Sequence, residues 1–532
     1  MKRTFAIAAA LVALCSLPAS GQLANAGKAG IYVKSLDQVL RLQEEDIDLA
    51  TAVLIASEYW SDIVAGRRYL ERLDAMAMEI QRRLARQGLP TDYRAIPIIN
   101  DYLFNELGYR TISHANDPND LFLHSVMDRR QGYCLSLSVL YLALAERLGL
   151  SVYGVVVPGH FFVRYDGGRV RFNIETTSNG ASPPDDHYML KFSVPDNVND
   201  TIYMKNLTKR QTLGCFFNNL GNVYSDIGDI DTAQVALERA TKINPTLSES
   251  RANLGNIYLQ KHRVNEAIQQ YRAALQLNPN DPKTYNNLGN AYTELDRLND
   301  AAAAYKEALG LDPNFTDAHR NLALVCTKQE RYNEAISHLN QAASIEPKNA
   351  QIYNQLGDVD CRMHNYAAAE TQFHKALSLK PDLAEAYYGL GICYREQSQP
   401  DNEIQAYKGA LAIKPDMLAA LVNLGNACFN QKDYASAIQY YNRAVTIKPD
   451  DAWIYFNLGS AYSNLEDFQQ AVKAYIQAIT LNPKIGDAHH GLAYGYYRLQ
   501  KYDLAWKHIN IAKTLGVKIS DDQVQAIKSR LK

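Results

Sequence analysis

The chain has 532 residues, a formal net charge of −2, and acidic and basic residues in nearly equal number. This length allows several domains. The basic residues form no stripe, so nothing argues for nucleic-acid binding, and no spacing of His, Cys, Asp or Glu matches a metal site. We therefore expect neither a metal nor another cofactor.

The first residues have the pattern of a secretory signal peptide. A charged start, Met1–Arg3, is followed by the apolar run Phe5–Leu14 and then by small residues, with cleavage expected after Gly21 or Ala26. The apolar run is too short to span a bilayer, and no later run is long enough. We therefore expect a signal peptide over residues 1–26 and a periplasmic or secreted mature protein without a membrane span.

A first folded domain is expected over residues 27–205. Its N-terminal part has apolar residues at helical spacing, such as Leu73, Met76 and Ile80, which is typical of the buried face of a helix. The helices expected here are Ser35–Leu42, Ile47–Tyr59, Ala65–Arg86 and Tyr93–Glu106. They would support the segment that follows.

The next helix is predicted over residues 135–148, which contain good helix formers and neither Pro nor Gly. Gly149 suits the left-handed residue that ends many helices. Cys134 should then lie at the start of this helix, where free backbone N–H groups and the positive end of the dipole favour a thiolate. Cys134 is therefore a candidate nucleophile. The alternative is a small apolar residue of the core.

Three strands are predicted next, over Ser151–Val157, Phe161–Asp166 and Arg169–Glu175. Gly167 and Gly168 would form a two-residue hairpin turn, because both turn positions need the positive φ that glycine adopts readily. The numbers of paired residues then sum to 335, which places His160 opposite Glu175 on one face of the sheet. A three-residue loop would instead place Ile174 opposite His160.

Together these side chains are the types that thiol catalysis requires. An imidazole takes the proton of a thiol, and a carboxylate orients the ring and supports its charged form. We therefore propose Cys134, His160 and Glu175 as candidate catalytic residues. Asn173 points the same way as Glu175 and is the second candidate for the orienting role. The alternative for His160 and Glu175 is a pair of solvent-exposed residues at strand ends.

Motifs around these residues resemble the SirB-type bacterial branch of the transglutaminase-like superfamily. The segments that carry the resemblance are Tyr102–Tyr109, Asp117–Leu123, Asp128–Ser138, Arg147–Leu150 and Pro158–His160. The resemblance implies an α+β, papain-like domain. It also implies Cys134 as nucleophile, His160 as base and Glu175 in the position of the acid, which is usually Asp in that superfamily.

From about Gly214 onward the sequence repeats every 34 residues. Alanine, glycine and tyrosine recur on this period, and a proline ends each second helix. The prolines are Pro245, Pro279, Pro313, Pro347, Pro381, Pro415, Pro449 and Pro483. The pattern resembles the tetratricopeptide helix–turn–helix repeat and predicts an all-α superhelical solenoid of nine repeats over residues 206–519. Residues 520–532 are expected to form a polar capping helix.

The first helix of most repeats carries an asparagine at one recurring position. These residues are Asn219, Asn253, Asn287, Asn321, Asn423 and Asn457. In the tetratricopeptide family the first helices line a concave face, and a ladder of carboxamides there can hold the backbone of an extended peptide. We therefore expect a protein or peptide partner in this groove. The alternative is that the amides are solvated and unoccupied.

The cysteines of the repeats are expected to be buried thiols, because most of them fall at apolar helix positions. They are Cys215, Cys326, Cys361, Cys393 and Cys428.

Two functions remain open from the sequence. The first is an exported thiol enzyme that acts on amides, as a peptidase, an amidase or an acyl-transferring enzyme, with repeats that recruit a protein partner. The sequence does not choose between water and an amine as acceptor. The second is a non-catalytic adaptor with an inactive transglutaminase-like domain. Cys134 and His160 favour the first, whereas the short separation between them in the chain leaves little room for substrate loops and favours the second.

Overall fold

A computed structural model describes residues 33, 35–60, 66–192, 194 and 201–531. The expected signal peptide, residues 1–26, lies outside the described residues. The chain divides into two compact units, with the boundary between Asp312 and Pro313. The first unit holds the mixed domain and the first three helix pairs of the repeats, and the second unit holds the remaining pairs.

The mixed domain is built mainly from helices. They are α2 (Leu36–Val39), α3 (Leu49–Trp60), α4 (Gly66–Arg86), α5 (Ile96–Asn100), α6 (Leu123–Arg129), α7 (Cys134–Arg147) and α8 (Asp185–Lys191). The helix predicted over Tyr93–Glu106 is three consecutive pieces, a short 3-10 turn, α5 and a π-helical segment at Asp101–Glu106. The helix predicted at Ser35 is shorter than expected.

The strands form two small sheets. A three-stranded antiparallel sheet has the order β3-β4-β5, and a parallel pair joins β1 to β2. Their bounds are β1 (Arg110–Thr111), β2 (Gln131–Gly132), β3 (Val152–Val157), β4 (His160–Asp166) and β5 (Arg171–Ile174). The α+β class predicted from the sequence is confirmed.

The predicted register of the second hairpin is wrong by two residues. Asp166 pairs with Arg171 and Val163 pairs with Ile174, so the numbers of paired residues sum to 337 rather than 335. The cause is a longer turn, in which Gly167 N–H donates to the carbonyl of Val170 at 3.0 Å. Because side chains alternate along a strand, a shift of two residues keeps every side chain on its predicted face.

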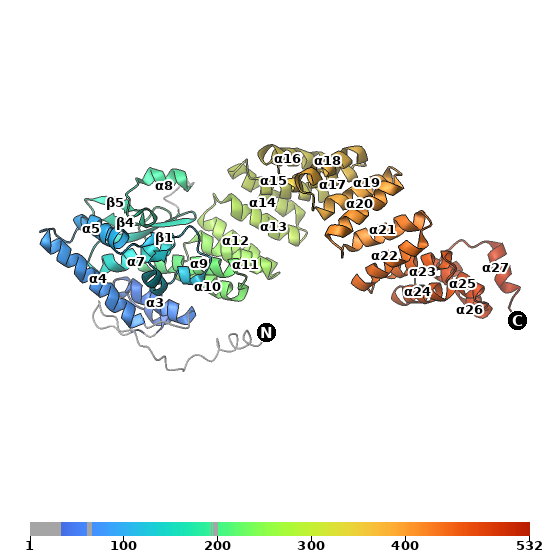
Figure 1. The fold of residues 1–532 in the computed structure, drawn as a ribbon, viewed down its shortest axis with the longest axis horizontal. Coiled ribbons are helices and arrows are strands. Elements are labelled where there is room, and N and C mark those ends of the chain that lie inside the picture. The colour runs from blue at the N-terminus through green and yellow to red at the C-terminus, as the bar shows by residue number, and fades with distance from the viewer. Residues whose placement is uncertain (1–32, 34, 61–65, 193, 195–200, 532) are drawn as a thin grey trace. The chain divides into compact units, whose positions relative to one another are not determined.

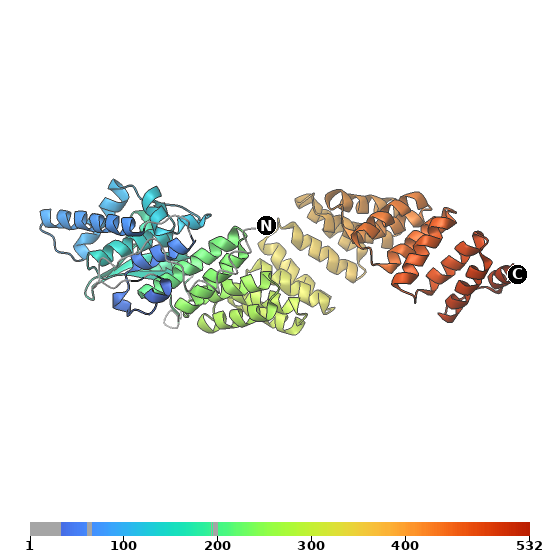
Figure 2. The same ribbon diagram turned by 90° about the horizontal axis from the view of Figure 1, so that it is seen from below.

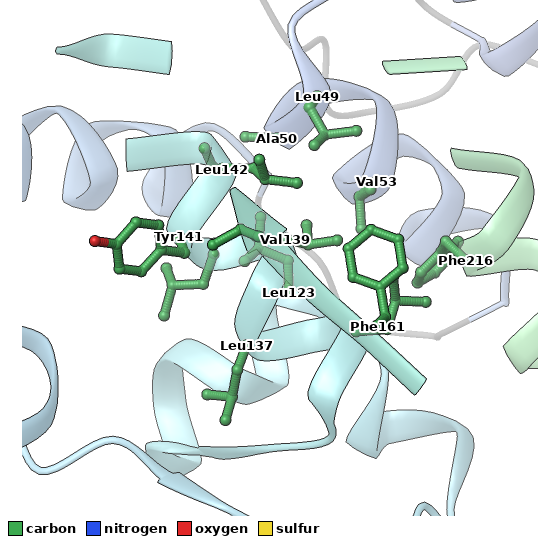
Figure 3. Close-up of a cluster of buried hydrophobic side chains, with 14 of the residues drawn as sticks. Leu49, Ala50, Val53, Leu123, Leu137, Val139, Tyr141, Leu142, Phe161 and Phe216 are labelled. Atoms are coloured by element: carbon green, nitrogen blue, oxygen red, sulfur yellow. The ribbon is translucent and has the colours of Figure 1, made fainter. Parts of the chain in front are cut away.

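The core of the first unit surrounds α7, which is apolar on nearly every side. Leu137, Val139, Tyr141 and Leu142 of α7 lie among residues of α3, α6, β4 and the first repeat helix (Figure 3). That repeat helix, α9 (Lys209–Asp226), supplies Phe216 to the same cluster. The mixed domain and the first repeat therefore share one continuous core.

The link between the two parts is fixed by hydrogen bonds. Met204 N–H donates to the carbonyl of Val156 at 3.1 Å, and Leu207 N–H donates to that of Gly154 at 2.9 Å, so the link runs along the outer edge of β3. Immediately beyond it, Lys209 Nζ donates to Glu146 Oε1 of α7 at 2.5 Å. The connection between the mixed domain and the first repeat is therefore short and tied to both β3 and α7.

Nine helix pairs occupy the described residues from 209 to 514 (Figure 1). They are α9 with α10 (Ile230–Ile243), α11 (Ser248–Gln260) with α12 (Val264–Leu277), α13 (Pro282–Glu294) with α14 (Leu298–Leu311), α15 (Thr316–Lys328) with α16 (Tyr332–Ile345), α17 (Ala350–Arg362) with α18 (Tyr366–Leu379), α19 (Ala384–Glu396) with α20 (Pro400–Ile413), α21 (Leu418–Asn430) with α22 (Tyr434–Ile447), α23 (Ala452–Asn464) with α24 (Phe468–Leu481), and α25 (Gly486–Arg498) with α26 (Tyr502–Thr514). A last helix, α27 (Asp521–Lys528), follows them. The side-by-side packing of consecutive helices within each unit is clear in Figure 2.

Two features recur with the 34-residue period and explain the tight pairs. In the first helix a glycine faces an aromatic ring of the second helix, as Gly289 faces Tyr305. In the turn between the helices one residue has positive φ, and in all repeats but the first this residue is not glycine. These residues are Gly228, His262, Asp296, Glu330, His364, Ser398, Lys432, Glu466 and Gln500. The recurring glycine was predicted from the sequence, but the aromatic ring that it faces and the residue of positive φ were not.

We expect Gly289→Ala to destabilise the chain and Gly310→Ala to stabilise it. A Cβ at Gly289 would lie 2.5 Å from the Tyr305 ring, which is buried and held by a 2.7 Å hydrogen bond from its hydroxyl to Asn290, whereas a Cβ at Gly310 meets nothing within 4 Å. Overpacking costs about 1–3 kcal/mol, and alanine regains up to about 1 kcal/mol of helix preference at either site.

Urea denaturation followed by circular dichroism measures both effects on the full chain. The expected order of midpoints is Gly289→Ala, native chain, Gly310→Ala, from lowest to highest. A midpoint for Gly289→Ala at or above the native value would contradict the close packing described for these helix pairs.

Candidate functional site

The start of α7 is held in place by its neighbours. Ser136 Oγ accepts a hydrogen bond from Tyr133 N–H at 2.9 Å and donates to the carbonyl of Asp120 at 2.8 Å. Gly132 has no room for a side chain, since a Cβ would lie 2.9 Å from Ser136 Oγ. Cys134 is the first residue of α7, as the sequence predicts, and is 5% exposed.

His160 connects the thiol to a carboxylate. It is the first residue of β4, its Nε2 lies 2.8 Å from Glu175 Oε2, and its imidazole lines the same cavity as Cys134, whose interaction with the ring raises the pKa of His160. The ring stacks on Phe192, with centroids 4.6 Å apart and planes 1° from parallel. The structure therefore brings the three candidate residues together in the order thiol, imidazole, carboxylate.

Glu175 follows β5 and is held by three other donors. Its Oε1 accepts hydrogen bonds from Thr177 N–H at 3.0 Å and from the Thr177 hydroxyl at 2.5 Å, and its Oε2 accepts one from the Tyr188 hydroxyl at 3.1 Å. In the observed register Glu175 does not lie directly opposite His160 but two residues away from that position. The bonds from Thr177 and Tyr188 hold its carboxylate there, so the contact between the Glu175 and His160 side chains persists despite the shifted register.

The electrostatics of the site favour the charged forms of the imidazole and the carboxylate. Burial alone would lower the pKa of His160, but its hydrogen bonds with Cys134 and Glu175 raise that pKa to about 9. Burial would raise the pKa of Glu175, but the hydrogen bonds from His160 and Thr177 outweigh burial and hold that pKa below its usual range. An imidazolium beside a thiol stabilises the thiolate, which is the nucleophilic form.

Asn173, the second candidate for the orienting role, lies in a different network. Its Oδ1 accepts a hydrogen bond from Arg164 Nε at 2.7 Å, and its Nδ2 donates to Asp185 Oδ1 at 2.7 Å. Arg164 is fully buried and also donates to Asp185 Oδ1 at 2.7 Å and to the carbonyl of Met204 at 2.6 Å. This network ties β4 and β5 to α8 and to the link, and it supports the site without touching His160.

The thiol and the imidazole open onto a cavity of about 320 Å³. One wall carries Cys134 and His160, and the other is formed by the first helices of the first three repeats. Three of the predicted asparagines, Asn219, Asn253 and Asn287, lie in that second wall. The cavity lies wholly within the first unit, so the candidate catalytic residues and this part of the asparagine ladder share one space.

The asparagine carboxamides also bond to the array itself. Asn253 Nδ2 donates to Asn218 Oδ1 at 3.1 Å, and Asn287 Nδ2 donates to Asn256 Oδ1 at 3.0 Å, so both bonds connect consecutive repeats. Asn219 Nδ2 donates to a carbonyl of its own helix. A carboxamide can make four hydrogen bonds, two from its N–H groups and two to its oxygen. Each of these bonds to the array uses only one of the four.

The other three asparagines lie in the second unit. Asn423 Nδ2 donates to the Tyr388 hydroxyl at 3.2 Å, and Asn457 Nδ2 donates to Asn426 Oδ1 at 3.3 Å. Asn321 lies on α15. A structural role between repeats is therefore common to asparagines in both units, and the sequence analysis did not anticipate it.

Two residues of the cavity were missed in the sequence. Tyr133 precedes the thiol in the chain and lines the cavity, and burial together with the charge of Cys134 raises the pKa of Tyr133 to about 12. Glu249 lies in the opposite wall and accepts a 2.6 Å hydrogen bond from the Tyr203 hydroxyl. Glu249 could have been identified from the sequence, because it lies in the first turn of a predicted repeat helix, α11.

Two kinds of feature are absent from the part of the chain that the structure describes. It contains no group of three or more His, Cys, Asp or Glu side chains that could hold a metal ion. None of its helices combines the length and apolar character needed to cross a membrane.

Family comparisons match two kinds of domain in the chain. A model of the transglutaminase-like superfamily matches residues 67–197, and tetratricopeptide models match residues 348–416, 425–466 and 452–485. A model of the cilia and flagella-associated protein 70 C-terminal domain matches residues 201–352.

Solved structures similar to this chain include repeat proteins. The pilF protein of Pseudomonas aeruginosa is 19% identical, with 40% of this chain and 96% of that chain covered and a TM-score of 0.36. A tetratricopeptide repeat protein of Parabacteroides merdae is 18% identical, with 47% and 98% covered and a TM-score of 0.37.

Curated relatives identify the family. A UPF0162 protein of Pseudomonas aeruginosa is 27% identical over 128 residues, which are 24% of this chain and 47% of that protein. A UPF0162 protein of Xylella fastidiosa is 30% identical over 218 residues, which are 38% of this chain and 73% of that protein. The resemblance to the bacterial branch of the transglutaminase-like superfamily is thus confirmed, and the chain belongs to the UPF0162 family, with a transglutaminase-like domain followed by tetratricopeptide repeats.

Proposed function

We propose that this chain is an exported thiol enzyme that acts on amide bonds of a protein or peptide held by its first repeats. The observation that carries the proposal is the cavity in which the Cys134–His160–Glu175 contacts face the asparagines of α9, α11 and α13. The expected signal peptide supports export to the periplasm or beyond the cell.

The reaction would proceed through an acyl-enzyme. The Cys134 thiolate attacks the amide carbonyl carbon, and His160, held by Glu175, donates its proton to the leaving amine as the C–N bond breaks. Water or a second amine then attacks the thioester, gives a proton to the imidazole, and releases the acyl product and the thiolate. The backbone N–H groups at the start of α7 are suited to stabilising the oxyanion of each tetrahedral intermediate.

The repeats would position the substrate. An extended peptide presents alternating N–H and C=O groups, and the carboxamides of Asn253 and Asn287 can bond to both kinds. Because α9 shares a core with α7, the groove formed by the first three repeats is held at a fixed distance from Cys134. A peptide in that groove can therefore reach the thiol without a movement between domains.

A non-catalytic adaptor is the second candidate function. The observation in its favour is the small exposed fraction of Cys134, 5%, in the substrate-free chain. On this reading the repeats bind a partner and the thiol stays unreacted. The reactivity of Cys134 separates the two candidates.

We expect Cys134 to react with iodoacetamide rapidly at neutral pH, because the protonated His160 stabilises its thiolate. His160→Ala should slow this reaction at pH 7 by roughly tenfold or more. Mass spectrometry of the labelled peptide measures the rate at Cys134 alone. The buried Cys428 serves as an internal control whose labelling His160→Ala should not change. Equal rates in both chains at pH 7 would favour the adaptor.

Glu175→Gln should lower the pKa of His160 from about 9 toward its ordinary value of 6.5, because the amide removes the negative charge beside the ring. NMR titration of the imidazole measures the change. Since the folded-state pKa of His160 is raised, its contribution to stability is fully present below pH 6.5 and is lost as the pH rises through about 9. The native chain should therefore lose stability relative to Glu175→Gln over that interval. An unchanged imidazole titration would contradict the assignment of Glu175.

The double variant Asn253→Ala, Asn287→Ala should weaken acylation of Cys134 by a peptide substrate. Loss of two hydrogen bonds costs about 1–3 kcal/mol, or roughly 5- to 150-fold. The measurement is the yield of acid-trapped thioester at Cys134 from a defined mixture of unlabelled peptides, and Cys134→Ala should give none. Asn423→Ala is the matched control, because it loses a comparable bond in the second unit. A yield that falls equally in the control would refute the groove assignment.

A further inference from the structure

Two cysteines of the second unit meet across consecutive repeats. Cys361 lies in the last turn of α17, Cys393 lies in α19, and their Sγ atoms are 3.3 Å apart. The S–S bond of a disulfide is about 2.05 Å long, so the sulfurs need to approach by only about 1.3 Å. α17 and α19 are the first helices of neighbouring repeats. Helices do not join one another through backbone hydrogen bonds, so side-chain packing holds this pair together.

The two thiols differ in their access to solvent. Cys361 is half-buried, whereas Cys393 is fully buried between its neighbouring helices. A reagent in solution can therefore reach the sulfur of Cys361 before that of Cys393. This asymmetry is the one needed for ordered thiol–disulfide exchange, in which an accessible cysteine reacts first and a buried one completes the reaction.

We propose that Cys361 and Cys393 form a disulfide that fastens α17 to α19. The Cys361 thiolate attacks one sulfur of an external disulfide, such as glutathione disulfide, and releases one thiol from it. The Cys393 thiolate then attacks the Cys361 sulfur and releases the second thiol. The two cysteines lose two electrons and two protons, and the external disulfide is reduced to two thiols.

The chemistry around Cys361 gives this exchange a pH dependence. Its hydrogen bond with Cys393 and its burial raise the pKa of Cys361 above the usual range. Because the thiolate is the attacking form, the cross-link should form faster as the pH rises. An oxidising compartment, which the expected export would provide, is where such a bond persists. The proposal does not depend on any reaction of Cys134.

The consequence for the array is a covalent bond between repeats that are otherwise held by packing. Consecutive repeats of a solenoid separate locally at a cost set by their shared interface. A cross-link between Cys361 and Cys393 closes the chain segment between them and restricts that opening. The reduced and oxidised chains therefore differ in the rigidity of the surface formed by α17 and α19.

The test treats the full chain carrying Cys134→Ala with glutathione disulfide at pH 8.5 and digests it with trypsin without reduction. The expected product is one cross-linked peptide that joins residues 349–362 to residues 376–395, and dithiothreitol should separate it. Cys393→Ser should instead stop at a glutathione adduct on Cys361, and Cys361→Ser should give neither product. Cys428→Ser is the matched control, since it removes a buried repeat thiol and should leave the cross-link intact.

Thermal unfolding supplies a second readout. Oxidation should raise the melting midpoint by on the order of 5 °C, and a chain lacking both Cys361 and Cys393 should show no such rise. A glutathione adduct that persists on Cys361 while Cys393 is present, or the absence of both products after prolonged oxidation, would overturn the proposal. If a serine variant fails to fold, the peptide map of the chain that retains both cysteines still decides.

Discussion

The structure of the first unit depends on the enclosure of α7. This helix is apolar on nearly all sides, so it is stable only where helices, a sheet and a repeat cover it together. Its covering elements, α3, β4 and α9, come from distant parts of the sequence. The same enclosure sets the N-terminus of α7 beside the start of β4, so that Cys134 and His160 line one cavity.

Two side chains of the site, His160 and Glu175, favour their charged forms although both are largely buried. Burial disfavours ionisation of both His160 and Glu175, yet each supplies the partner that the other needs. Stacking on Phe192 fixes the plane of the ring, and the two bonds from Thr177 fix the carboxylate. The imidazole therefore has little freedom, and its orientation is set by the fold.

The elements and the grouping of the site could be predicted because they follow from short-range patterns. A helix start after Gly132 and alternation along two strands were enough to put His160 and Glu175 on one face, even with the wrong turn length. The contacts of Asn253 and the pairing of Cys361 with Cys393 could not be predicted, since they depend on the distance between repeats. A repeat pattern shows that positions are equivalent but not which of them touch.

The boundary between the two compact units lies inside the repeats, at residue 312, and not where the family resemblance changes near residue 205. Family matches mark which segments resemble known domains, whereas compact units mark which segments pack together. Phe216 belongs to the repeats by sequence and to the core of the mixed domain by packing. The transglutaminase-like domain of this chain is consequently not an independent folding unit, because removal of the first repeat would expose part of its hydrophobic core.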